Sequence, residues 1–125
     1  MFVKNYQEVE AQKVEEAPGV TVRWVISEKD GAPHFAMRVF EVQPGYATPY
    51  HPHWFEHEVF VLAGQGKVRS ENAEHPLQAG NVVFIPGEEL HQFVNTGDEV
   101  LRFICLIPHA WLRNARKASY DCCAG

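Results

Sequence analysis

Short runs in which apolar and polar residues alternate make up most of this chain. Successive side chains of a β-strand point to opposite faces, so a period of two is typical of strands with one buried face. Gly, Pro, Asn and Asp separate the runs, as expected at tight turns. In the first run, Val20, Val22, Trp24 and Ile26 are expected to share one face. The predicted strands cover residues 20–27, 34–42, 58–63, 67–70, 81–86, 91–95 and 100–108.

This pattern leaves few architectures open. Only two segments are compatible with a helix: residues 6–16, which could equally form an extended arm, and residues 110–120. A parallel α/β fold needs crossover helices between its strands and is therefore excluded. Many short strands with almost no helix predict an all-β antiparallel barrel or jelly roll. We expect an N-terminal arm over 1–19, one barrel over 20–108 and a C-terminal tail over 109–125.

Charge and hydropathy exclude two classes of partner. The formal net charge is −5 and the pI is about 5.8, so no basic surface is predicted for nucleic acid. No apolar run approaches the ~20 residues that span a bilayer, and the N-terminal stretch is too acidic for a signal peptide. Three cysteines, an odd number, fit a reducing compartment. We therefore expect a soluble cytoplasmic protein.

Three histidines, His51, His53 and His57, fall within seven positions just before an apolar strand. Residues two apart in an extended chain project to the same side, so His51 and His53 face one way, and His57 shares that side if the chain stays extended. Buried polar groups without partners cost about 1–3 kcal/mol each, whereas a divalent metal satisfies imidazole nitrogens. His91, which opens a strand after a second Pro-Gly loop, is the best fourth ligand.

The other three histidines fit such a site less well. His75 lies in a polar hairpin and His109 follows the last strand, so we expect both on the surface. His34 begins a strand and could line the mouth of a pocket.

Further residues are candidates for the wall of a pocket around the histidines. They are Arg38, Trp54, Phe55, Phe93, Phe103 and Cys105. Arg38 would bind a substrate carboxylate if it points inward. Trp54 and Phe55 either wall the pocket or pack in the core. Cys105 is either a soft group near the metal or an inert buried thiol. Asn95 is expected to hold a loop by hydrogen bonds.

The histidine pattern resembles the two motifs of the cupin family, G-x5-H-x-H-x3/4-E-x6-G and G-x5-P-x-G-x2-H-x3-N. Residues at the required spacing are Gly45, His51 and His53 in the first motif, and Gly80, Pro86, His91 and Asn95 in the second. The similarity spans residues 36 to about 108, most of the chain. Both motifs also have the separation that the family shows, which makes the resemblance specific.

Two positions differ from the family pattern. The central glycine of the second motif would be residue 88, which is Glu88, while a glycine stands at Gly87, so we expect that loop to turn differently.

Counting back from Gly64, the metal-binding glutamate of the first motif falls on His57, with Glu58 one position later. Strand parity favours His57 and turns Glu58 outward. The stretch HPHWFEHEVFVLAG resembles small bacterial cupins that bind metal with four histidines. The resemblance thus implies the ligands His51, His53, His57 and His91, with Glu58 as the alternative to His57.

The resemblance also implies further properties. It implies a double-stranded β-helix, or jelly roll, with one divalent transition metal per chain and a homodimer that exchanges N-terminal strands. Manganese is common in the subgroup, and four imidazoles also accept Fe, Co, Ni, Cu or Zn. Neutral ligands leave the metal its full charge, which favours an anionic small molecule. The implied function is a metal-dependent enzyme, a dioxygenase-type, lyase or isomerase cupin. A non-enzymatic metal- or metabolite-binding module is the alternative.

Overall fold

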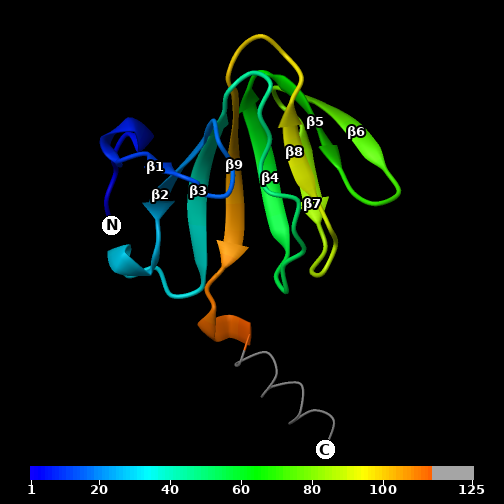
Figure 1. The fold of residues 1–125 in the computed structure, drawn as a ribbon. Helices are drawn as coiled ribbons and strands as arrows, with labels where there is room; N and C mark the ends of the chain where they lie inside the picture. The colour runs from blue at the N-terminus through cyan, green and yellow to red at the C-terminus, as the bar shows by residue number, and fades with distance from the viewer. Residues whose placement is uncertain (114–125) are drawn as a thin grey trace, which may run out of the picture.

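The computed structural model describes residues 1–113. Its strands are β1 (Gln12–Lys13), β2 (Val20–Ile26), β3 (Phe35–Val42), β4 (His57–Ala63), β5 (Gln65–Arg69), β6 (Glu74–Gln78), β7 (Val82–Ile85), β8 (Gln92–Asn95) and β9 (Leu101–Pro108). The 3-10 helices are η1 (Tyr6–Glu8) and η2 (Glu28–Asp30). Two antiparallel sheets result, with the orders β1-β2-β3-β9-β4-β7 and β6-β5-β8 (Figure 1). The predicted all-β jelly-roll fold is confirmed.

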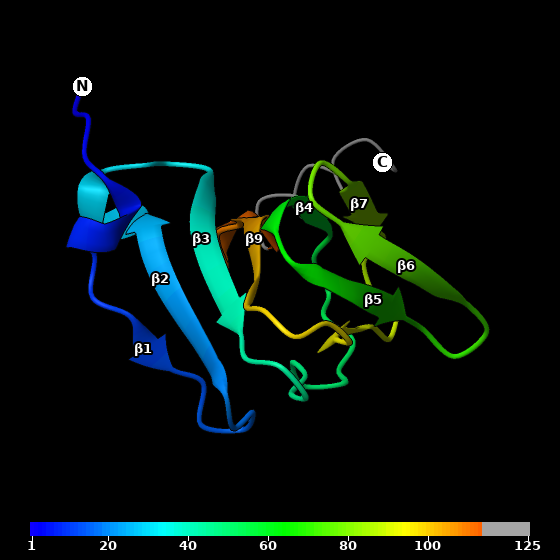
Figure 2. The same ribbon diagram turned by 90° about the horizontal axis from the view of Figure 1, so that it is seen from above.

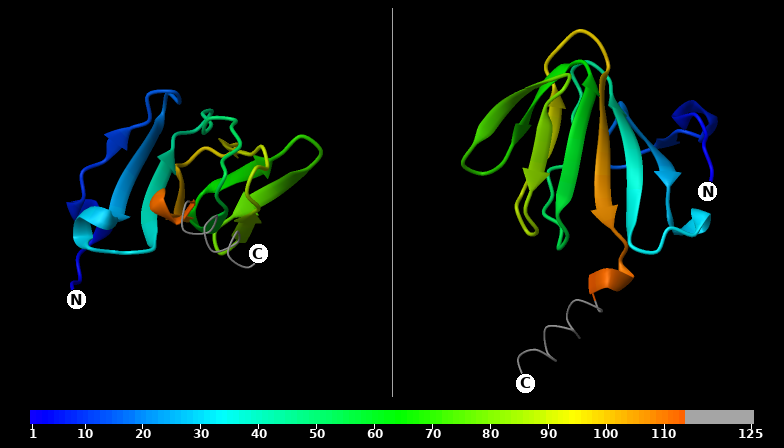
Figure 3. Two further views of the ribbon diagram at one scale, coloured as in Figure 1. Left: turned by 90° about the horizontal axis from the view of Figure 1, so that it is seen from below. Right: turned by 180° about the vertical axis from the view of Figure 1, so that it is seen from behind.

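The smaller sheet lies beside the β4–β7 end of the larger one, and β1, β2 and β3 lie on the far side (Figure 2). The views from below and from behind show the same arrangement (Figure 3). The loop over residues 96–100 lies at one end of the barrel, and the loops before β4 and after β7 lie at the other (Figure 1). Within residues 1–113, no helix is long or apolar enough to cross a membrane.

Strand β9 is the centre of the core. Its residues alternate between buried and partly buried along its whole length, and Leu101, Phe103 and Cys105 face inward. The register places Cys105 opposite Arg38 of β3 on one side and Val59 of β4 on the other. These side chains therefore form one row across the inner face of the sheet. This row underlies the pocket described below.

Two strands were not predicted from the sequence. Strand β1 lies in the segment for which a helix or an arm was considered, and the helix is wrong because only η1 is helical there. Strand β6 lies in the polar hairpin and is exposed at all positions except Leu77. Both strands lie at sheet edges, where two exposed faces leave no alternation to read. Of the helix predicted over 110–120, residues 111–113 are helical, and the rest lies outside the described residues.

A β-bulge changes the face that strand β2 presents. Trp24 pairs with Arg38, but the register shifts before Ile26, which pairs with Met37. Val25 is buried as a result, and Trp24 remains 39% exposed. The predicted shared face therefore ends at Trp24. An extra residue in one strand reverses the parity that follows it, and the sequence pattern did not reveal this.

Asn95 fixes the loop between β8 and β9, as predicted. Its amide nitrogen donates to the carbonyl oxygens of Val42 and Glu99, each at 2.8 Å. Its Oδ1 accepts the backbone N–H of Gly97 at 2.9 Å. The side chain is buried, so no water replaces these bonds if they are lost.

We expect Asn95→Ala to lower the free energy of unfolding by about 2–4 kcal/mol, because it removes three hydrogen bonds and leaves buried carbonyl groups unpaired. Asn81→Ala is the matched control. The Asn81 side chain accepts one bond, from the Gln78 backbone at 2.8 Å in an exposed turn, and its loss should cost about 0.5–1 kcal/mol. Urea denaturation measures both values. Equal losses would contradict the assignment of Asn95 as the anchor of this loop.

Candidate metal centre

Three histidines from separate segments converge inside the barrel. His57 is the first residue of β4, His53 lies in the loop before it, and His91 immediately precedes β8. One ring nitrogen from each lies within 4.8 Å of the other two. The ring centroids are 4.5 Å apart for His57 and His91, 5.1 Å for His53 and His57, and 5.5 Å for His53 and His91. Within residues 1–113, this is the group of side chains arranged to hold a metal ion.

Backbone pairing joins the two loops that carry these histidines. An antiparallel bridge links His51 to His91. Nearby, the Thr48 N–H donates to the Phe93 carbonyl, and the Phe93 N–H donates to the Thr48 hydroxyl, both at 2.9 Å. The segment before His53 is therefore held against the start of β8 by hydrogen bonds like those between neighbouring strands. This pairing brings the first histidine motif to the second.

The loop between β7 and β8 also supports His53. The Glu88 N–H donates to the His53 carbonyl oxygen. Glu88 has φ of 70°, the left-handed region that favours glycine, so position 88 keeps such a turn although its residue is not glycine. Gly87 has another role, because a Cβ there would lie 2.5 Å from the Trp54 carbonyl oxygen. The shift of the glycine has thus not removed the left-handed turn from position 88.

The ring nitrogens of the three histidines have few protein partners. The Nδ1 of His91 lies 2.9 Å from the Glu89 carbonyl oxygen, so it carries the proton and leaves Nε2 with a free lone pair. The Nδ1 atoms of His53 and His57 are buried and have no hydrogen-bond partner among the described residues. Buried imidazoles without partners in this part of the chain, in a cluster where one ring nitrogen of each converges, fit a site for a metal ion.

Burial keeps all three imidazoles neutral. It lowers the pKa of His57 to about 3, with further contributions from His91, Arg38 and His53. Burial is also the largest cause of the lowered pKa values of His53 and His91. Neutral imidazole is the form that binds a metal. The donor set therefore fits a divalent transition metal at neutral pH.

The fourth predicted ligand, His51, lies at the rim. Its side chain is 51% exposed, and its Nδ1 lies 3.7 Å from a Glu16 carboxylate oxygen. Its ring centroid is 6.4 Å from that of His53. The structure thus brings three of the four predicted histidines together, and the role of His51 stays a prediction. Glu58, the alternative ligand, is exposed and lines a different surface together with Glu56.

A pocket of about 230 Å³ surrounds the histidines. Its lining residues are Val14, Glu16, Val22, Arg38, Phe40, Thr48, Pro49, His51, His53, His57, His91, Phe93, Phe103 and Cys105. Arg38, Phe93, Phe103 and Cys105 were candidates from the sequence, and their roles toward a ligand stay predictions. Sequence reasoning missed Val14 and Glu16, which come from the N-terminal segment. No local signal marked them, because their position depends on how that segment crosses the barrel.

The predicted wall residues Trp54 and Phe55 lie outside this pocket. The Phe55 ring stacks on the His53 ring, with centroids 4.9 Å apart and planes 14° apart. Trp54 meets Phe55 edge to face at 5.3 Å. Both line a neighbouring groove instead. Phe55 therefore packs against the His53 ring from the groove side.

The thiol of Cys105 faces an arginine. Nη2 of Arg38 donates to Sγ of Cys105 at 3.3 Å. Burial raises the pKa of Cys105 despite the arginine, so the thiol is protonated at neutral pH. Metals bind the thiolate form, and Cys105 is not part of the histidine cluster. The geometry favours the buried inert thiol of the two alternatives for Cys105.

The remaining histidines lie away from the centre. His75 is exposed, as predicted. The surface position predicted for His109 is wrong, because it is only 8% exposed and its Nε2 lies 2.7 Å from the Ala32 carbonyl oxygen. Its backbone N–H also bonds to the His34 carbonyl oxygen, so the chain after β9 packs back onto the loop before β3. His34 is exposed, 6.0 Å from the Trp111 ring, and lines neither the pocket nor the groove.

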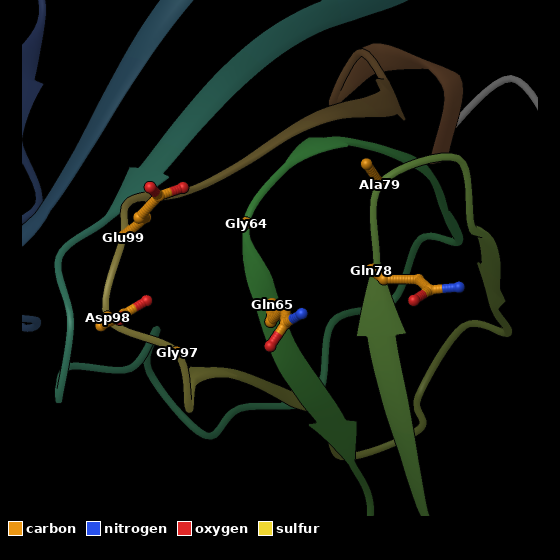
Figure 4. A pocket seen from close by; sticks show the side chains of 7 residues that line it. All are labelled: Gly64, Gln65, Gln78, Ala79, Gly97, Asp98 and Glu99. Atoms are coloured by element: carbon orange, nitrogen blue, oxygen red, sulfur yellow. The ribbon is translucent and has the colours of Figure 1, made fainter.

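A second cavity, of about 650 Å³, lies past the far end of β4, away from His57 (Figure 4). Its lining residues are Gly64, Gln65, Gln78, Ala79, Gly97, Asp98 and Glu99. None of them is a histidine, cysteine or arginine. The converging histidines and Arg38 thus lie at the other cavity.

Comparison with known proteins identifies the family. Residues 38–107 match the family Cupin_2, described as a cupin domain. The 1-methylthio-D-xylulose 5-phosphate methylsulfurylase of Rhodospirillum rubrum is 35% identical over 71 residues, which are 57% of this chain and 46% of the relative. The oxalate-binding protein of Thermotoga maritima is 32% identical over 80 residues, 61% of this chain and 66% of the relative. The chain thus spans about half to two thirds of these curated relatives.

A solved structure is similar over more of its length. The polyketide cyclase RemF from Streptomyces resistomycificus superposes with a TM-score of 0.81 at 33% identity. The superposition covers 86% of this chain and 79% of that one. The likeness thus extends over most of this chain.

The histidine cluster should make the metal-free protein sensitive to acid. The pKa of His57 is about 3 in the folded protein and about 6.5 in an unfolded chain, so between these values the unfolded chain binds more protons. The contribution of neutral His57 to the free energy of unfolding is therefore fully present above pH ~6.5 and is lost as the pH falls toward 3. We expect His57→Gln to flatten the dependence in urea denaturation of chelator-treated protein.

The matched control is His75→Gln, which changes an exposed histidine on an edge strand and should leave the pH dependence as in the wild type. The same slope in His57→Gln and in the wild type would contradict the burial of a neutral His57.

Proposed function

The chain belongs to the cupin family, and from this premise we propose that it is a metal-dependent enzyme that holds one divalent ion. The proposed ligands are His51, His53, His57 and His91. The observation that carries the proposal is the convergence of three neutral imidazoles, two of which have a buried nitrogen with no partner among residues 1–113. Manganese is the metal proposed, from the resemblance to the four-histidine subgroup.

His51 is proposed as the fourth ligand because its backbone is already paired with His91 and its side chain lines the same pocket. Its present neighbour, the Glu16 carboxylate, has an oxygen 3.7 Å from His51 Nδ1, is exposed to solvent, and holds the ring only weakly. Glu58 is not proposed, because the alternation along β4 directs it away from the barrel interior.

When bound, the metal would supply Lewis-acid or redox chemistry to a coordinated substrate. The chain's own groups prepare the pocket for that substrate. Phe40, Phe93 and Phe103 line it with apolar surface and exclude water. Arg38 supplies a positive charge, and Glu16 is the carboxylate available from the lining residues to move a proton. The substrate proposed is a small anionic organic molecule, and the reaction class is a dioxygenase, lyase or isomerase type.

A second candidate function is binding without catalysis. The relative from Thermotoga maritima is named an oxalate-binding protein, and oxalate is a small chelating dianion that suits the same open metal. The polyketide cyclase, in contrast, favours the enzyme. Turnover of a bound anion, measured after metal loading, distinguishes the two.

The assembly is also a proposal. We infer a homodimer in the cytoplasm that exchanges the arm over residues 1–19. The arm's sheet contact is short, since β1 pairs with β2 through Gln12 and Lys13. The same arm contributes Val14 and Glu16 to the pocket. Exchange of the arm would therefore supply each pocket with a carboxylate from the other chain.

The test of the metal proposal is metal content per chain, measured by mass spectrometry on protein purified from manganese-supplemented cells. Wild-type protein should retain about one ion per chain. His57→Ala should lose it, since one of three converging ligands is gone. Glu58→Ala, the same change one residue further on the opposite face, should retain it. Loss in Glu58→Ala with retention in His57→Ala would contradict the ligand set, and no metal in the wild type would overturn the proposed function.

A further inference from the structure

A groove next to the histidine pocket is lined by all three tryptophans of the chain. Trp24 comes from β2, Trp54 from the loop before β4, and Trp111 from the segment after β9. The groove has a volume of about 770 Å³. Trp24 and Trp111 are 39% and 47% exposed, so their rings remain accessible to a ligand. Aromatic faces that remain open in a groove are suited to stacking on a planar ligand.

Only a thin layer of side chains separates this groove from the pocket. Arg38 lines both cavities. Its guanidinium carbon lies 5.2 Å from the Trp24 ring centroid, on the groove side, and 4.9 Å from that of Phe40, on the pocket side. Phe55 lines the groove and stacks on His53, which lines the pocket. A molecule in the groove can therefore contact Arg38, which also lines the histidine pocket.

Among residues 1–113, Arg38 has no anionic partner for its positive charge. Its recorded polar contact is the weak one to Cys105, and its Nε is buried without a hydrogen-bond partner among residues 1–113. Two other arginines of the larger sheet, Arg23 and Arg102, both pair with Glu41. Burial of an unpaired cation is unfavourable, and an anionic ligand offsets this cost. The guanidinium fork matches a carboxylate with two parallel hydrogen bonds.

The rest of the groove does not select an anion by its charge. Its rim carries the cations Lys4 and Lys29 and the anions Glu10, Glu28 and Asp30. Lys4 lies 3.7 Å from Asp30, so part of this charge is paired within the protein. Recognition of a negative group therefore falls to Arg38, at the inner end.

The sizes of the two cavities agree with a shared ligand. Alone, the pocket of about 230 Å³ is smaller than the roughly 300–1,000 Å³ typical of sites for organic ligands. The groove falls within that range but lacks the histidines. A ligand that extends across Arg38 uses both.

We propose that the substrate is an aromatic carboxylate, with its carboxylate on Arg38 and its ring system among the three tryptophans. Arg38 is then the anion-binding residue of the site, and the groove determines specificity for a planar ring. The inference rests on the proposed function only for the statement that this ligand is the substrate. Binding of the ligand to Arg38 and the groove does not require the metal.

The test uses 2-naphthoate as the probe. Its neutral isostere 2-naphthamide removes the charge, and acetate removes the ring. Calorimetry with zinc-loaded and with chelator-treated protein should show that 2-naphthoate binds both forms at least tenfold more tightly than either analogue. Nitrogen-15 NMR of the indole N–H groups gives a second readout. The three tryptophan signals should shift with 2-naphthoate and not with acetate.

Arg38→Met should weaken 2-naphthoate binding at least tenfold, because it keeps the apolar stem and removes the charge. Arg102→Met is the matched control, since Arg102 also lies on the larger sheet but is paired with Glu41 and lines neither cavity. It should leave binding unchanged. If Arg38→Met does not fold, the comparison of 2-naphthoate with 2-naphthamide on wild-type protein decides instead.

Equal affinity for 2-naphthoate and 2-naphthamide, unchanged affinity in Arg38→Met, or unshifted indole signals would each overturn the inference. So would 2-naphthoate binding that disappears in chelator-treated protein, because the anion would then be on the metal. Binding through Arg38 by a protein that retains no metal after purification would support the inference and overturn the proposed function. The two failures are thus distinguishable.

Discussion

The backbone bridge between His51 and His91 is the constraint on which the site depends. Strands β4 and β8 belong to different sheets, and nothing in their local sequence makes their histidines meet. The pairing of Thr48 with Phe93 extends that bridge and fixes the loop before His53. Asn95, at the other end of β8, fixes the next loop by three hydrogen bonds. Strand β8 is therefore anchored on both sides, which fixes the position of His91, while the pairing of β4 with β7 fixes that of His57.

Burial acts on two kinds of group at this site, with opposite consequences. For the histidines, it disfavours the charged form, so the rings are neutral and their nitrogens are available as ligands. For Arg38, burial lowers the pKa, but a guanidinium remains charged in proteins, so Arg38 stays a cation without an anionic partner in the described part of the chain. A metal ion would bind the free imidazole nitrogens, and an anion would pair with the charge of Arg38. The pocket thus combines neutral donors that suit a metal ion with a positive charge that suits an anion.

Much of this arrangement could be predicted from the sequence. The alternation of apolar and polar residues predicted the central strands and the all-β fold. The opposite faces of successive residues in β4 predicted that His57 points inward and Glu58 outward. What could not be predicted depends on contacts between distant segments. The position of Glu16 depends on the path of the N-terminal segment, and the burial of His109 on its bond to Ala32. The bulge in β2 and the edge strand β6 leave no periodic signal. The groove needs three tryptophans from three separate elements, so no stretch of sequence contains it.

The central claim is that one ion lies among His53, His57 and His91. The most direct test is crystallographic, with anomalous diffraction collected on both sides of the manganese edge from protein loaded with that metal. The account predicts one strong difference peak per chain, between these three rings and in contact with a nitrogen of each, with His51 turned toward it. A peak bound by Glu58, or no peak inside the barrel, would contradict it.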